Sequence, residues 1–166
     1  MMTEGHSTRP VPVASAITLV LGITAAMIVF AVDPLGGMIA LAGLCCLLVG
    51  LLRPRPGLLS LGSFGIGLGV LLVGLFGADP IPLVVATMAT ILSWDTAHNA
   101  ASLGRQLGTA ADPTIPAIAH LSGGLVAGGI TAGLSIGIYQ AISGGYTSTA
   151  VALCGLAGLC IVAALR

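Results

Sequence analysis

The stretch VPVASAITLVLGITAAMIVFAV, residues 11–32, is followed by Asp33-Pro34 and then by LGGMIALAGLCCLLVGLL, residues 35–52. Neither run contains a charged residue, and only an acid and a proline separate them. A helix needs about 20 apolar residues to cross a hydrocarbon core of about 30 Å, because each residue adds about 1.5 Å. The two runs therefore predict a pair of membrane-spanning helices joined by a tight turn.

The same criterion applied to the rest of the chain finds four further spans. They cover residues 58–76, 80–101, 116–142 and 147–165. The predicted fold class is therefore all-α, a polytopic bundle of six transmembrane helices. We expect a single transmembrane domain over residues 11–166, preceded by a polar cytoplasmic tail over residues 1–10.

The overall composition agrees with this prediction. Apolar residues make up 57% of the chain and charged residues 6%, whereas an ordinary soluble domain has about 25% charged residues. So few charges cannot form a water-facing surface, which makes the lipid bilayer the expected environment. The formal net charge is zero, and without a basic surface nucleic acid is not an expected partner.

The arginines predict the orientation of the spans. With six spans and a cytoplasmic N-terminus, all five arginines fall on one side: Arg9, Arg53, Arg55, Arg105 and Arg166. Asp33 and Asp79 fall on the other side. Because arginine and lysine accumulate in cytoplasmic loops, we expect both termini in the cytoplasm and a multi-pass protein of the plasma membrane.

Three acidic residues have the pattern of helix caps. Asp33, Asp79 and Asp112 each precede a proline and then an apolar run. An aspartate at this position accepts hydrogen bonds from backbone N–H groups that lack a helical partner, and a proline in the first turn loses no bond. We predict a helix start at each of these three sites.

The 25 glycines predict how the helices pack. Glycine recurs at four-residue spacing at Gly65/Gly69, at Gly124/Gly128 and at Gly129/Gly133/Gly137. Small residues at this spacing let helix backbones approach closely in lipid. We therefore expect close helix–helix contacts on the third and fifth spans.

One polar segment, Trp94–Leu107, interrupts the apolar pattern. A helix through it would place five polar residues on a single face: Asp95, His98, Asn99, Ser102 and Gln106. Asp95 would lie about 22 Å along a helix that starts at Pro80, still at membrane depth. His120, near the start of the fifth span, would approach the same face. These six residues form the candidate binding site.

Several interpretations of this site are open. Asp95 and His98 are suited to a proton or ion relay, since ionisable groups at membrane depth are usually functional. A metal ion held by Asp95, His98 and His120 is a second possibility, but their spacing matches no established ligand motif. The third interpretation is structural: Trp94 lies in the headgroup region, and Asp95 contacts His98 or Arg105. The sequence contains no catalytic motif, so we expect neither enzymatic activity nor a cofactor.

The pattern W-D-x-x-x-N-A-x-x-L-G-x-Q-L-G over residues 94–108, with Ala119-His120 and the terminal Val162-Ala-Ala-Leu-Arg166, resembles an uncharacterised family. That family consists of small multi-pass membrane proteins from halophilic archaea. The resemblance implies no assigned activity. It does imply an accessory role beside an AAA ATPase system.

Two functional hypotheses follow. The first is a non-enzymatic accessory or scaffold subunit that recognises a protein partner, or a second copy of itself, through the segment Trp94–Gln106. The alternative is a small transporter or channel subunit with a polar pathway at Asp95 and His98. The alternative requires several assembled copies, because few polar residues line any one bundle.

Overall fold

A computed structural model describes residues 11–53, 55–107 and 114–142. These residues form five helices and no strand: α1 (Pro12–Val32), α2 (Pro34–Leu52), α3 (Pro56–Leu75), α4 (Pro80–Leu107) and α5 (Thr114–Ile142). All five are long and apolar enough to cross a membrane. The all-α prediction is confirmed for these residues, and the chain has the architecture of a membrane protein.

The observed helices differ from the predicted spans mainly in α4. This helix continues to Leu107, six residues beyond the predicted end at residue 101, so the polar segment extends the helix rather than ending it. The sixth predicted span over residues 147–165 lies outside the described residues. So do the N-terminal tail and the predicted cap at Asp112.

Proline and aspartate define the helix starts. Helices α1 to α4 each begin at a proline, whose fixed φ suits the first turn. The Asp33 carboxylate accepts a 2.7 Å hydrogen bond from the Gly36 N–H, and that of Asp79 accepts one of 3.1 Å from the Ile81 N–H. After α3, Gly77 adopts a φ of 81°, a left-handed conformation that glycine reaches without strain.

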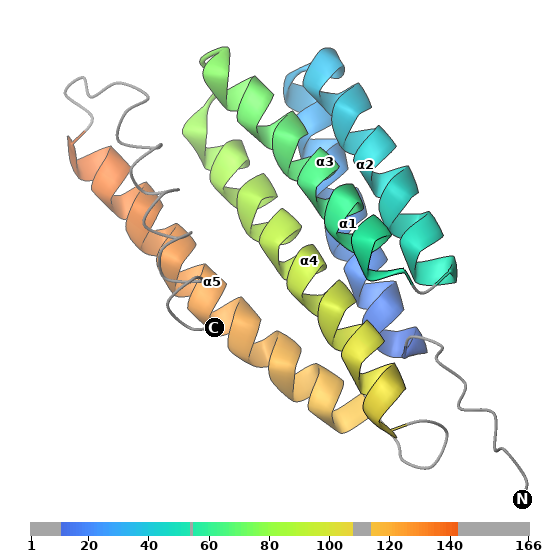
Figure 1. The fold of residues 1–166 in the computed structure, drawn as a ribbon. Coiled ribbons are helices and arrows are strands. Elements are labelled where there is room, and N and C mark those ends of the chain that lie inside the picture. Colours follow the sequence, from blue (N-terminus) through green and yellow to red (C-terminus); the bar gives the residue numbers. More distant parts are fainter. Residues whose placement is uncertain (1–10, 54, 108–113, 143–166) are drawn as a thin grey trace, which may run out of the picture.

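Helices α1 to α4 form an antiparallel bundle, and α5 lies against its outside (Figure 1). The most extensive contacts are between α2 and α3 and between α1 and α4. Helix α5 packs mainly on α4 and touches α1 only slightly. The start of α1, the α2–α3 connection and the end of α4 share one end of the bundle (Figure 1). A hydrogen bond from the Val11 N–H to the Ala100 carbonyl joins α1 to α4 there.

Glycine allows α2 and α3 to approach each other backbone to backbone. A Cβ atom added to Gly43 would lie 2.5 Å from the Ile66 nitrogen and 2.7 Å from the Gly62 carbonyl oxygen. One added to Gly65 would lie 2.8 Å from the Gly43 Cα. Another at Gly69 would lie 2.6 Å from the Gly36 carbonyl oxygen. Any larger residue at these positions would push the two helices apart.

The glycines of α5 lie in different surroundings. Added Cβ atoms at Gly124 and Gly128 would meet the side chains of Leu92 and Met88 on α4, at 3.0 and 3.2 Å. At Gly129, Gly133 and Gly137, no atom of the described residues lies within 4 Å of such a Cβ. Gly124 and Gly128 therefore lie on the face of α5 that packs on α4, and the other three glycines face away from the described helices.

The α2–α3 contact generates a testable prediction. Gly43→Ala should lower the thermal stability of the purified protein in detergent, because the new methyl group meets backbone atoms that cannot rotate away. Overpacking of this kind costs about 1–3 kcal/mol. The temperature at which half of the monodisperse protein is lost, followed by size-exclusion chromatography, measures the effect.

Gly57→Ala is the matched control, since within the described part of the chain no atom lies within 4 Å of an added Cβ at Gly57. Alanine favours a helix over glycine by about 1 kcal/mol, so the control should be at least as stable as the original chain. Equal stability of the two variants would contradict the close approach.

Candidate functional site

The polar segment of α4 has a buried face and a partly exposed face. Buried side chains point toward α1 and the bundle core: Ser93, Thr96, Ala97, Ala100 and Ala101. Four predicted site residues lie on the other face and are partly exposed: Asp95, His98, Asn99 and Ser102. We call these four residues the outer stripe. Helical periodicity separates the two sets, because residues three or four apart share a face.

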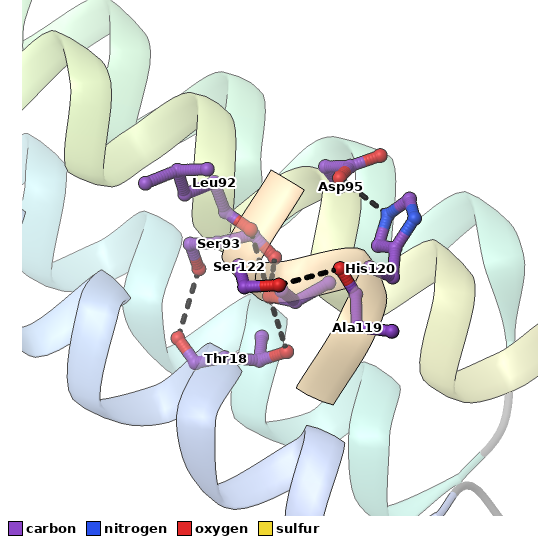
Figure 2. Close-up of polar contacts among 8 residues, drawn as sticks. Thr18, Leu92, Ser93, Asp95, Ala119, His120 and Ser122 are labelled. Carbon is purple, nitrogen blue, oxygen red and sulfur yellow. Dashed lines mark hydrogen bonds and ion pairs between the residues drawn. The ribbon is translucent and has the colours of Figure 1, made fainter. Parts of the chain in front are cut away.

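On the buried face, hydroxyl groups connect α4 to α1 (Figure 2). Ser93 Oγ donates a 2.9 Å hydrogen bond to the Thr18 carbonyl, and the hydroxyls of Thr18 and Thr96 are hydrogen-bonded at 3.0 Å. Thr96 in turn donates to the Leu92 carbonyl at 2.7 Å. Because the Thr18 and Thr96 hydroxyls bond to each other and the Ser93 hydroxyl bonds to the Thr18 carbonyl, these groups stabilise the α1–α4 contact.

On the exposed face, Asp95 contacts α5. Its Oδ2 lies 2.6 Å from Nε2 of His120, and Figure 2 shows the carboxylate and the imidazole ring directed at each other. The two side chains are 46% and 43% exposed, so the pair lies on the outside of the bundle. It is a hydrogen bond when the imidazole is neutral and an ion pair when the imidazole is protonated. The contact joins α5 to the polar segment of α4.

His98, one turn further along α4, contacts α3 instead. Its Nε2 and the Ser60 Oγ share a hydrogen bond of 3.1 Å. The Trp94 and His98 rings make an edge-to-face contact with centroids 5.5 Å apart. The two histidines therefore join different pairs of helices: His98 joins α4 to α3, and His120 joins α5 to α4.

This geometry does not favour a metal site. No three histidine, cysteine, aspartate or glutamate side chains cluster within the described part of the chain. The structural interpretation had Asp95 contacting His98 or Arg105, whereas its observed partner is His120. The side chains of Arg105 and Gln106 lie outside the described residues.

Sequence reasoning missed the hydroxyl partners of the site. Ser60, Thr18 and Ser93 lie in apolar spans and match no motif. The positions of these residues along their helices could have indicated the pairing. Ser60, for example, lies near the start of α3, at the bundle end where α4 finishes. Polar residues at one depth on neighbouring antiparallel helices are candidates for pairing, since lipid offers them no other partner.

The arrangement offers polar groups that can bind. The outer stripe carries a carboxylate, an imidazole, an amide and a hydroxyl along one edge of α4, between α3 and α5. The His98 imidazole lies beside the Ser60 hydroxyl, whereas the Asp95 carboxylate contacts His120, so these contacts do not join the three residues into a serine–histidine–aspartate triad. A polar edge of this kind is suited to recognising another polar surface.

Comparison with known proteins gives one finding. No curated protein and no solved structure matches the chain. A model of a family of unknown function, DUF7519, matches residues 8–162. The match names no activity or source, so the haloarchaeal origin and the sequence motif stay predictions. Because the match covers nearly the whole chain, the protein belongs to the DUF7519 family.

Proposed function

We propose that this chain is a non-enzymatic accessory or scaffold subunit of a membrane-associated assembly. The outer stripe of α4, together with His120, would form its docking surface for a protein partner. The observation that carries the proposal is the half-exposed Asp95–His120 pair on the outside of the bundle, between two helices that are long and apolar enough to cross a membrane. The resemblance noted above suggests an AAA ATPase system as the partner.

The energetics of the bilayer support a covered stripe. A charged side chain at the centre of a membrane helix costs about 2.5–3.5 kcal/mol on insertion scales. Pairing with His120 offsets part of this cost for Asp95, but both side chains keep nearly half of their surface exposed. A partner with polar groups, docked between α3 and α5, would provide hydrogen bonds to the parts of these two side chains that stay exposed.

The buried face argues against transport through a single chain. The core of α1 to α4 is built mainly of alanine, leucine, isoleucine and valine. The buried hydroxyls at the α1–α4 contact have partners: those of Thr18 and Thr96 bond to each other, and that of Ser93 donates to the Thr18 carbonyl. A polar pathway through Asp95 and His98 would therefore have to run between chains, on the same surface that we assign to a partner.

We also propose that the chain spans the plasma membrane six times with both termini in the cytoplasm. The distribution of charge supports this orientation. Arg53, Arg55 and Arg105 lie at one end of the bundle, and Asp33 and Asp79 lie at the other. The end with the arginines would face the cytoplasm.

The docking surface can be tested by recovery of partners. In a tagged protein purified from its native membrane, the double change Asp95→Ala and Asn99→Ala should abolish co-purification of the partner, because it removes the carboxylate and an amide from the stripe. Mass spectrometry of the purified complex measures the loss. Membrane insertion should be unchanged, since both side chains lie outside the core.

The control is Asp79→Asn, which removes one charge at the opposite end of the bundle and keeps an oxygen for the helix cap. This variant should retain the partner. The proposal fails if the double variant, inserted at normal levels, recovers the same partners as the original chain.

The orientation can be tested by cysteine labelling. In a chain without its four native cysteines, Arg55→Cys should react with a membrane-impermeant maleimide only after the cells are permeabilised. Asp79→Cys, at the other end of the bundle, should react in intact cells. Labelling of position 55 from outside would reverse the proposed orientation.

A further inference from the structure

We propose that a cleft between α3 and α4 binds one anionic phospholipid, with an acyl chain in the cleft and the phosphate at Arg53 and Arg55. The cleft has a volume of about 560 Å³. Its lining includes Gly57, Ser60, Ser63 and Phe64 of α3, and Thr90 and Trp94 of α4. We call it the α3–α4 cleft. The proposal is independent of the docking surface above.

The shape of the cleft is suited to an extended chain. A second hollow of about 250 Å³, lined by Phe64, Gly67, Leu68 and Leu71, continues along α3 and shares Phe64 with the first. From Gly57 to Leu71 the two hollows extend about 21 Å along the helix, at about 1.5 Å per residue. One leaflet of a hydrocarbon core of about 30 Å is about 15 Å deep, so the residues that line the two hollows together cover the depth of a leaflet.

Ser63 provides an unused hydrogen-bonding group in the cleft. The residue is only 5% exposed, and its hydroxyl has no hydrogen-bond partner among the described residues. Thr90, across the cleft, bonds instead to the Ala86 carbonyl of its own helix. An unpaired buried hydroxyl is costly, and native proteins normally give such a group a partner.

A phospholipid would supply that partner at the right depth. Ser60 and Ser63 lie about 6 and 10 Å along α3 from Pro56. A lipid whose phosphate lies at the start of α3 would place its glycerol ester carbonyls a short distance deeper, near these two residues. A small rotation of the Ser63 side chain would let its hydroxyl donate to an ester oxygen.

The charge at the mouth of the cleft favours an anionic headgroup. Arg53 ends α2 and Arg55 precedes α3, two residues before Gly57, and both arginines are exposed. In the described part of the chain neither guanidinium is in an ion pair. Guanidinium groups bind phosphate oxygens through paired hydrogen bonds, so two of them attract a lipid with net negative charge.

An apolar helix would satisfy this site less well. Either the predicted span over residues 147–165 or a second copy of the chain could fill the hollows with side chains. A covering of that kind would leave the Ser63 hydroxyl and the two arginines without polar partners. A phospholipid carries a phosphate, ester carbonyls and an acyl chain in that order. The site offers their partners in the same order: Arg53 and Arg55, then Ser60 and Ser63, then the apolar lining of the hollows.

Trp94 makes the proposal directly measurable, because it is the only tryptophan of the chain and it lines the cleft. Lipids with brominated acyl chains quench a nearby indole. We expect brominated phosphatidylglycerol to quench Trp94 at a lower mole fraction than brominated phosphatidylcholine with identical chains. The attraction of anionic lipid by each arginine corresponds to about a fivefold difference in affinity.

Three variants test the arginines, the cleft and the Ser63 hydroxyl one at a time. The double change Arg53→Gln and Arg55→Gln should remove the preference for phosphatidylglycerol. Gly57→Leu should fill the cleft and weaken quenching by both lipids, without disturbing the bundle, because no atom of the described residues lies within 4 Å of an added Cβ. Ser63→Ala should weaken lipid binding about fivefold, and it should not lower the stability of the lipid-free protein, because it removes a buried hydroxyl that lacks a partner there.

Gly123→Leu on α5 is the matched control for Gly57→Leu, since an added Cβ there also meets no atom of the described helices within 4 Å, and its quenching should equal that of the original chain. Equal quenching of the original chain by the two lipids would overturn the anionic assignment. If Gly57→Leu leaves the quenching unchanged, the α3–α4 cleft is not the binding site. Absence of quenching by either lipid would also overturn it, in favour of a helix of this chain or of a second copy.

Discussion

Helices in a bilayer gain nothing by hiding apolar surface from lipid, so this bundle depends on how closely its backbones approach. The closest approach is between α2 and α3, where Gly43 lies against Gly62 and Gly65 with no side chain between them. Dispersion forces act over a few ångströms, and only glycine permits this separation. The α2–α3 pair in turn positions the start of α3, from which Ser60 reaches His98 on α4.

The second structural constraint is that polar side chains need partners inside the protein. The polar side chains on the two faces of α4 find their partners in different ways. Toward α1, Ser93 and Thr96 bond to Thr18 in a buried contact. On the other face, Asp95 pairs with α5 and His98 with α3, while these side chains stay partly exposed. One helix thus combines a buried polar contact on one face with a partly exposed polar edge on the other.

The two proposed binding surfaces lie on neighbouring parts of α4. Trp94 contacts His98 of the outer stripe and also lines the α3–α4 cleft. A lipid in the cleft and a partner on the stripe would therefore share a boundary along one turn of α4. This proximity suggests that lipid composition influences docking, since the Trp94 and His98 rings border both surfaces.

The helical class, the membrane environment and the helix starts at proline can be predicted from the sequence alone, because length, hydropathy and φ restriction are local properties. Helical periodicity also places Asp95, His98, Asn99 and Ser102 on one face. The packing of the helices was needed to show that His120 is a partner of Asp95, that Ser60 is a partner of His98 and that Gly129, Gly133 and Gly137 lie away from the described bundle. Those outcomes depend on which helices become neighbours and at what rotation, and a nearly uniform apolar surface does not encode that choice in any short stretch of sequence.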